Sequence, residues 1–185
     1  MLLVLPFMLS PVSAEETYNN DHGVSYLRMH VGAVRFLDAP PFASQYGYLF
    51  GVAYEWPLWT ALDIRWDGGS SIHSSKQDST FNVNNKKLFF TSSHLSLVLH
   101  TPSRSYIRPL VLVGIGMADA RLGSDDHWFG ELVFGGGVDF LPTEMTFFEM
   151  TGMKLSLETR YRRSFNTSFP IPSGLEFYFS FGGDF

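Results

Sequence analysis

The strongest pattern in the chain is the alternation of apolar and polar residues over 174–185. One parity holds Leu175, Phe177, Phe179, Phe181 and Phe185, and the other holds Glu176, Tyr178, Ser180, Gly182 and Asp184. Such alternation predicts a β-strand with one apolar and one polar face. In a sheet surrounded by water, such an aromatic face on the last strand would be an exposed edge prone to aggregation. The pattern therefore favours a strand whose apolar face contacts lipid.

The same alternation recurs upstream and predicts seven more strands, at about 24–37, 45–56, 58–67, 87–100, 106–119, 128–141 and 153–164. Pro57 is expected to leave room only for a tight turn between the second and third strands. Strands of roughly 10 to 14 residues suit tilted membrane strands, which need about 9–11. The predicted fold class is all-β, an eight-stranded antiparallel up-and-down transmembrane β-barrel.

The connections between these strands differ in length on the two sides of the barrel. Longer polar loops are predicted at 38–45, 67–86, 119–128 and 164–174. Two of the other three connections are very short, and the third, 142–152, is longer than expected. In such barrels the long loops lie outside the cell and the short turns in the periplasm. Both termini are therefore predicted to be periplasmic, and aromatic girdles are expected from Trp56, Phe140 and Phe185 at the turn ends and Tyr46, Trp66 and Tyr161 at the loop ends.

The rival architecture is a soluble eight-stranded barrel of the lipocalin type, which also alternates but places its apolar parity inside. Here the apolar parity is wide, branched and aromatic, whereas the polar parity carries charges of both signs and most strand glycines. A charge facing lipid at the bilayer centre would cost about 2–4 kcal/mol, so the charges are assigned to the lumen. Arg163 falls on the apolar parity, but at a strand end, where it can reach lipid headgroups.

An eight-stranded barrel is just wide enough for side chains to fill its interior. Unpaired charges there would be costly, so we predict a cross-strand ion-pair network that plugs the lumen. Its candidate members are Arg28, Asp63, Arg65, Glu131, Asp139, Lys154, Glu158, Arg160, Arg162 and Glu176.

This pattern resembles the small eight-stranded bacterial outer-membrane barrels: the OmpA transmembrane domain, OmpX and the OmpW-type proteins. The charged inward parity is closer to the OmpA and OmpX pattern than to the apolar lumen of OmpW-type barrels. The final aromatic strand resembles the assembly signal of these barrels, which would be Phe177, Phe179, Phe181 and Phe185. The resemblance implies a bacterial outer-membrane location and insertion by the barrel-assembly machinery, and no specific ligand. Outer-membrane lipid and lipopolysaccharide are the expected partners, and the expected state is a monomer.

The N-terminus and the composition add three expectations. Residues 1–14 are predicted to be a signal peptide, because a short apolar core precedes the small-residue site Val12-Ser13-Ala14; 15–23 would be a periplasmic lead and 24–185 the barrel. The absence of cysteine excludes disulfides and Cys-bound zinc. A net charge of −5 argues against a nucleic-acid partner.

One short constellation suggests chemistry. His94-Leu95-Ser96 resembles the histidine–serine pair of the lipid A 3-O-deacylases, with Glu131 as a candidate third catalytic member. Residues i and i+2 share a strand face, so an imidazole could activate the hydroxyl. However, Leu95, Leu97 and Leu99 are predicted to lie on the outer face. This prediction places His94 and Ser96 in the lumen rather than against lipid.

The six histidines are scattered without metal-ligand spacing, so no metal site and no cofactor is predicted. The favoured function is a non-enzymatic, porin-like outer-membrane barrel with a plugged lumen, at most a small ion conductance, and surface loops for envelope structure, adhesion or contact with a host or extracellular ligand. The alternative is a lipid A deacylase-like acyl hydrolase.

Overall fold

The computed structural model describes residues 25–38, 43–59, 61–75, 88–101, 107–122, 125–141, 153–165 and 173–184. The predicted signal peptide, the periplasmic lead, the 142–152 connection and Phe185 lie outside the described residues. No described helix has the length and apolar character needed to cross a membrane.

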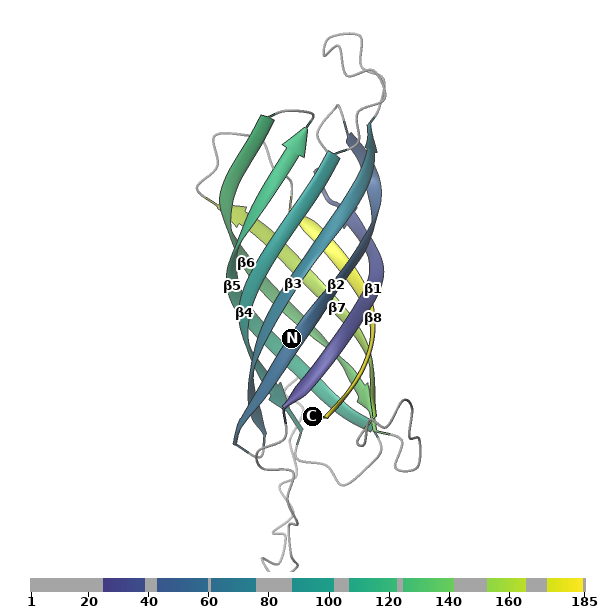
Figure 1. Ribbon diagram of the computed structural model, residues 1–185, viewed down its shortest axis with the longest axis vertical. Helices are drawn as coiled ribbons and strands as arrows, with labels where there is room; N and C mark the ends of the chain where they lie inside the picture. Colours follow the sequence, from purple (N-terminus) through teal and green to yellow (C-terminus); the bar gives the residue numbers. More distant parts are fainter. Residues whose placement is uncertain are drawn as a thin grey trace, which may run out of the picture.

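Eight antiparallel strands form the structure, and each pairs with the next along the chain. They are β1 (Tyr26–Phe36), β2 (Ala43–Trp59), β3 (Leu62–Ser75), β4 (Leu88–His100), β5 (Ile107–Leu122), β6 (Asp125–Phe140), β7 (Lys154–Phe165) and β8 (Gly174–Asp184). Strand β8 pairs with β1 from Tyr26↔Asp184 to Phe36↔Gly174 and closes the barrel. Strand β1 therefore begins and β8 ends at the same end of the barrel (Figure 1). The predicted fold class is confirmed.

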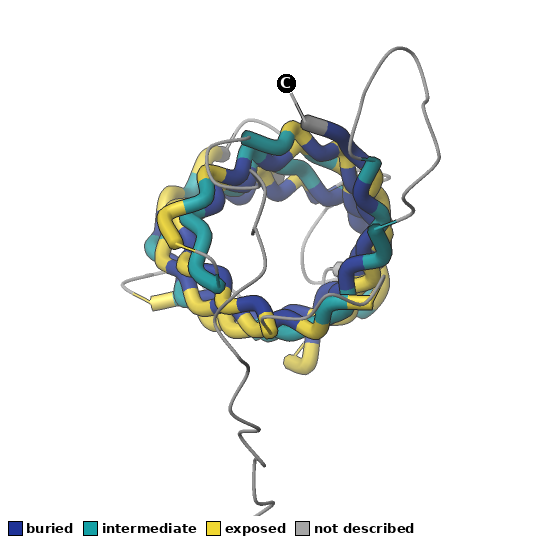
Figure 2. The backbone as a smooth tube through the Cα atoms, turned by 90° about the horizontal axis from the view of Figure 1, so that it is seen from below, coloured by how far each residue is buried: buried dark blue, intermediate teal, exposed yellow. Residues whose placement is uncertain are grey.

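Buried and exposed residues alternate along the strands (Figure 2). The apolar parity is outside and the polar parity is inside. On β5, for example, Val111, Val113 and Met117 are 57%, 47% and 58% exposed, while Leu112 between them is buried. On β7, Lys154, Glu158, Arg160 and Arg162 are all buried inside the barrel. A water-soluble barrel would hide its apolar parity, so this arrangement fits a barrel whose outside meets lipid.

Two predicted loops prove to be partly strand. Strand β3 continues to Ser75, so only residues 76–87 separate it from β4, and β5 and β6 pair up to Leu122↔Asp125 with two residues between them. The predicted loops 67–86 and 119–128 were therefore too long. Beyond the apolar band both faces of a hairpin can be polar, because its hydrogen bonds come from the backbone. A polar sequence there does not imply a loop.

Pro57 was also wrongly assigned to a turn. It lies inside β2 opposite Asp63, next to a register shift between Pro57 and Trp59, and β2 continues beyond it to Trp59, which pairs with Leu62. A proline, which has no N–H to donate, is tolerated in a strand beside such an irregularity. Trp66, predicted to lie at a loop end, sits well inside the extended β3 and pairs with Tyr54 and Leu95.

The interior has an apolar zone at the loop end. It consists of Val34, Phe36, Leu49, Leu88, Phe90, Ala118, Ala120, Phe129 and Tyr178. A smaller apolar cluster of Val98, Leu110, Leu112 and Val133 lines one wall nearer the turn end. The rest of the interior, mostly on β1, β2, β3, β7 and β8, is occupied by charged side chains. These charges form the candidate site.

Candidate functional site

Buried charges of both signs fill the middle of the barrel. Among the described residues, the buried inward cations are Arg28, Arg65, Lys154, Arg160 and Arg162, and the buried inward carboxylates are Glu55, Asp67, Glu131, Asp139, Glu158 and Glu176. Each of these eleven side chains has an oppositely charged partner within ion-pair distance. Pairing is what makes so many buried charges tolerable, because an isolated buried ion would cost several kcal/mol.

Glu55 on β2 is the first centre of this network. Its Oε2 accepts hydrogen bonds from Arg28 Nη2 at 2.6 Å and Arg65 Nε at 2.8 Å, and its Oε1 accepts one from Lys154 Nζ at 2.6 Å. The three cations come from β1, β3 and β7. One carboxylate thus joins strands from different sides of the barrel.

Glu158 on β7 is the second centre. Arg65 Nη1 donates to its two oxygens at 2.8 and 2.9 Å, and Arg160 Nη2 donates to Oε2 at 2.8 Å. Arg160 also reaches back to Asp67 on β3, with an Nη2–Oδ1 distance of 3.0 Å. Strands β3 and β7 are four positions apart in a ring of eight, so they face each other across the lumen. These two contacts therefore cross the barrel along its diameter.

A third group lies beyond this crossing, toward the loops. Glu131 on β6 is 2.8 Å from His94 Nε2 and 3.1 Å from Arg162 Nε. Arg162 also lies 3.2 Å from Glu176, which accepts a hydrogen bond from the Tyr178 hydroxyl at 2.5 Å. This group connects β4, β6, β7 and β8 just below the loop-end apolar zone.

All ten residues predicted for the network lie inside the barrel within ion-pair distance of a partner. The partner of Asp63 is His100, with 2.7 Å between Asp63 Oδ2 and His100 Nε2. Sequence reasoning left out Glu55, Asp67 and His100 from the set. Glu55 and His100 were on the inward parity and could have been included by parity alone. Asp67 was missed because the third strand was ended there, whereas β3 continues for eight more residues to Ser75.

The candidate catalytic group is only partly assembled. His94 and Glu131 are in contact, as a catalytic pair would require, and both are buried in the lumen. Ser96 is also buried, and its Oγ has no hydrogen-bond partner among the described residues, so it makes no hydrogen bond to the His94 ring. The pair therefore belongs to the interior of the barrel, and its side chains do not face lipid.

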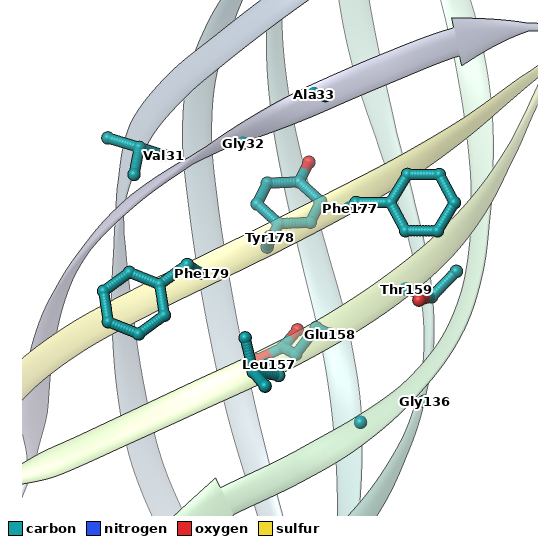
Figure 3. A pocket seen from close by; sticks show the side chains of 11 residues that line it. Val31, Gly32, Ala33, Gly136, Leu157, Glu158, Thr159, Phe177, Tyr178 and Phe179 are labelled. Carbon is teal, nitrogen blue, oxygen red and sulfur yellow. The ribbon is translucent and has the colours of Figure 1, made fainter.

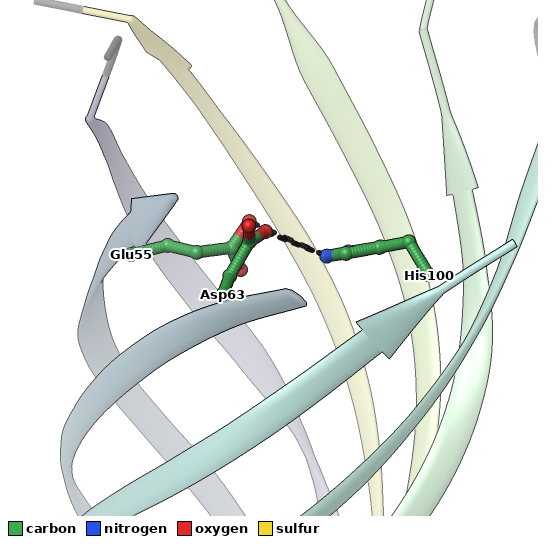
Figure 4. A group of neighbouring side chains, drawn as sticks. All are labelled: Glu55, Asp63 and His100. Carbon is green, nitrogen blue, oxygen red and sulfur yellow. Dashed lines mark hydrogen bonds and ion pairs between the residues drawn. The ribbon is translucent and has the colours of Figure 1, made fainter. Parts of the chain in front are cut away.

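One group has metal-ligand composition. The ligand atoms of Glu55, Asp63 and His100 lie within 4.8 Å of one another at the turn end of the lumen (Figure 4). However, the Glu55 carboxylate is already held by three cationic side chains, and Lys154 Nζ also lies 2.9 Å from Asp139 nearby. A divalent cation would meet these positive charges. The group is better described as the turn-end part of the ion-pair network.

No protein-family model and no curated protein sequence matches this chain. Solved structures do match. Neisserial surface protein A has a TM-score of 0.60 at 13% identity over 87% of this chain and 97% of that one. Ail, the attachment invasion locus protein of Yersinia pestis, in complex with the heparin analogue sucrose octasulfate, has a TM-score of 0.54 at 12% identity over 88% and 98%. The outer-membrane enzyme PagL has a TM-score of 0.50 at 15% identity over 86% and 99%.

The chain has the fold of the small outer-membrane barrels. At these identities the likeness concerns the fold, and the neighbours' activities remain their own. The predicted resemblance to this class is confirmed. The closed barrel and its apolar exterior also fit the predicted location, a bacterial outer membrane.

Proposed function

We propose that this protein is a non-enzymatic outer-membrane barrel whose lumen is plugged and whose loop-end surface makes the contacts outside the cell. The observation that carries the proposal is the pair of contacts between β3 and β7, Arg65–Glu158 and Arg160–Asp67, which span the lumen. Insertion by the barrel-assembly machinery and a monomeric state belong to the same proposal.

A second layer supports the plug on the loop side. The rings of Phe36 and Phe90 are 5.3 Å apart, those of Phe90 and Phe129 are 6.4 Å apart, and His73 stacks on Phe36 at 4.1 Å. These rings come from β1, β3, β4 and β6 and meet inside the barrel. A solute entering from outside would have to displace this cluster and then break the ion pairs below it.

Planar-bilayer recording tests the plug. The purified full chain is expected to show no channel wide enough for a sugar or an amino acid, and at most a small ion conductance as single ion pairs rearrange. Glu158→Gln removes a carboxylate that Arg28, Arg65 and Arg160 share, so it should raise any small conductance. Asp126→Asn, at the exposed loop-end rim, is the matched control and should leave it unchanged. A wild-type conductance blocked by added sugar would make the protein a substrate channel instead.

The contact surface is proposed at the loop end, where the β3–β4 and β5–β6 hairpins reach further than β7 and β8 (Figure 1). Their outer faces are polar there: Ser70 and Thr91 are 3.3 Å apart, and Arg121 on β5 contacts Asp119 at 2.7 Å and Asp126 at 3.2 Å. Loops carried on a rigid scaffold are where binding residues concentrate. Two neighbours described as a surface protein and an attachment protein have the same fold, which supports adhesion or ligand contact here.

Limited proteolysis of intact cells tests which end is outside. Trypsin should cut after Lys76, Lys86 or Lys87, between β3 and β4, while the strands stay protected by their hydrogen bonds. Arg104, between β4 and β5, is the internal control, because it should be cut only after the periplasm is opened. Cleavage in the opposite order would reverse the proposed orientation.

The alternative function is acyl hydrolysis by His94, Ser96 and Glu131, favoured by the His94–Glu131 contact and by the outer-membrane enzyme among the neighbours. The lumen position of all three residues weighs against it. Ser96→Ala is expected to leave the acylation pattern of the cell's lipid A unchanged, measured by mass spectrometry of extracted lipid. If a deacylated lipid A species were lost in the variant while the abundance of the barrel was unchanged, the result would support the acyl hydrolase function instead.

A further inference from the structure

The outer wall of the barrel has a groove that the plug and the loops do not explain. It has a volume of about 510 Å³ and crosses β1, β8, β7 and β6 (Figure 3). Its outward-facing lining residues are Val31, Ala33, Gly136, Leu157, Thr159, Phe177 and Phe179. The groove is mostly apolar and opens on the side of the barrel that meets lipid.

The register between strands explains the shape of the groove. Ala33, Phe177, Thr159 and Gly136 form one row across the four strands, because Ala33 and Thr159 pair with Phe177 and Gly136 pairs with Thr159. The row on the turn side, Val31, Phe179, Leu157 and Val138, holds only large residues, and so does the row on the loop side, Arg35, Leu175, Tyr161 and Phe134. The small residues thus form two furrows, one on each side of Phe177.

Two cations lie on the loop side of these furrows and face outward. Arg35 is in the next row, two residues from Ala33 and about 7 Å further along the strand; Arg163 is four residues from Thr159, about 14 Å further. Both side chains are exposed. Neither has an ion pair with a described residue, unlike Arg121, the other outward arginine of the described strands. The ring of Tyr46 lies 5.9 Å below the Arg35 guanidinium.

The position of the groove selects one leaflet. Phe177 is three residues from Gly174, where β8 begins at the loop end, and Ala33 is three residues from Phe36, where β1 ends there, so this side of the groove lies in the loop half of the barrel wall. Gly136, at the other end of the row, is four residues from Phe140 and lies nearer the turn end. If the loops face outward, as proposed above, this half contacts the outer leaflet. The apolar furrows suit acyl chains, and the two cations beside them suit the anionic phosphates of a lipid headgroup. Two furrows beside one another match a lipid with several chains.

We propose that this groove binds one outer-leaflet phosphorylated glycolipid of the lipid A type, with acyl chains in the furrows beside Phe177 and headgroup phosphates on Arg35 and Arg163. The proposal rests on the proposed orientation, and it goes beyond it by naming the lipid class and the residues. Such a lipid would join β8 to β1 and β7 on the outside, where the first and last strands close the barrel.

Native mass spectrometry of the full chain released from nanodiscs tests the site. The nanodiscs contain phosphatidylethanolamine alone, with added lipid A, or with added phosphatidylglycerol. Wild type should retain lipid A in preference to both phospholipids. Arg35→Gln with Arg163→Gln should lower lipid A retention about fivefold for each arginine removed, whereas Arg121→Gln, an outward arginine away from the groove, should not.

The furrows are tested separately by filling them. Ala33→Leu with Thr159→Leu keeps the exterior apolar and should reduce lipid A retention, whereas Val111→Leu with Val113→Leu on the exterior of β5 should not. Unchanged retention in both the arginine and the furrow variants overturns the site, and equal retention of phosphatidylglycerol overturns the choice of glycolipid. Failure of the plug or loop proposals would appear in the conductance and proteolysis measurements, which do not depend on these residues.

Discussion

Replacing Glu55 by glutamine is expected to lower the free energy of unfolding by about 3–5 kcal/mol, because removing one partner of a buried ion pair leaves the other charge uncompensated. Glu55 is fully buried and holds Arg28, Arg65 and Lys154 at 2.6 to 2.8 Å. Glutamine has nearly the same shape, so the effect isolates the charge from packing. Guanidinium unfolding of the barrel in phospholipid vesicles, followed by tryptophan fluorescence, measures it.

Asp126→Asn is the matched control. It also removes a carboxylate from a contact with an arginine, but Asp126 is 49% exposed and Arg121 is 57% exposed. An exposed pair contributes only about 0–1 kcal/mol, so the control should change stability little. Equal effects of the two substitutions would show that the interior is hydrated enough to screen its charges, and the plugged lumen would then be wrong.

A double variant separates the charge network from local damage. Lys154→Met added to Glu55→Gln removes one of the three cations that lose the Glu55 charge in the first change. The double variant should therefore be less destabilised than the sum of the two single changes. Additive effects would mean that the 2.6 Å contact between Lys154 and Glu55 contributes no coupling free energy to stability.

The sequence predicts the number of strands, which face of each strand is apolar, and that the charged side chains point into the lumen. This is possible because a side-chain period of two leaves each strand only two possible orientations. A lipid-facing charge is costly enough to choose between them. The strand ends could not be read in this way. Gly68, Gly69 and Ser70 resemble a loop in composition, yet β3 continues through them because backbone pairing with β4 does not depend on side chains.

The candidate site shows the same division. Parity predicts which side chains enter the lumen, and the predicted order of eight strands places the third strand across from the seventh. Neither gives the relative heights of residues on the two strands, so the Arg65–Glu158 contact was not predictable as a pair. The contact between His94 and Glu131 was equally hidden, because the residues are 37 positions apart on non-adjacent strands. The exterior groove depends on the alignment of small residues across four strands, which only the register reveals.

The second large effect is expected on the outer wall. Val113 lies midway along the outward face of β5, 47% exposed between Val111 and Ile115. If this face meets the hydrocarbon core, Val113→Arg should lower the free energy of unfolding in vesicles by about 2–4 kcal/mol. The same vesicle unfolding experiment measures it, with Val113→Leu controlling for the change in side-chain size.

Placing arginine at a second depth along the same strand tests whether this result is specific to a bilayer. Met117→Arg places the same charge four residues nearer the loop end, beside the polar rim of Asp119 and Arg121. Near the interface an arginine should cost only about 0–1 kcal/mol, because its long side chain reaches the headgroups. The difference between Val113→Arg and Met117→Arg should disappear when both are measured in a small detergent micelle, whose apolar region is thinner. A barrel that exposes this wall to water would tolerate both arginines equally in every medium, and the outer-membrane assignment would fail with it.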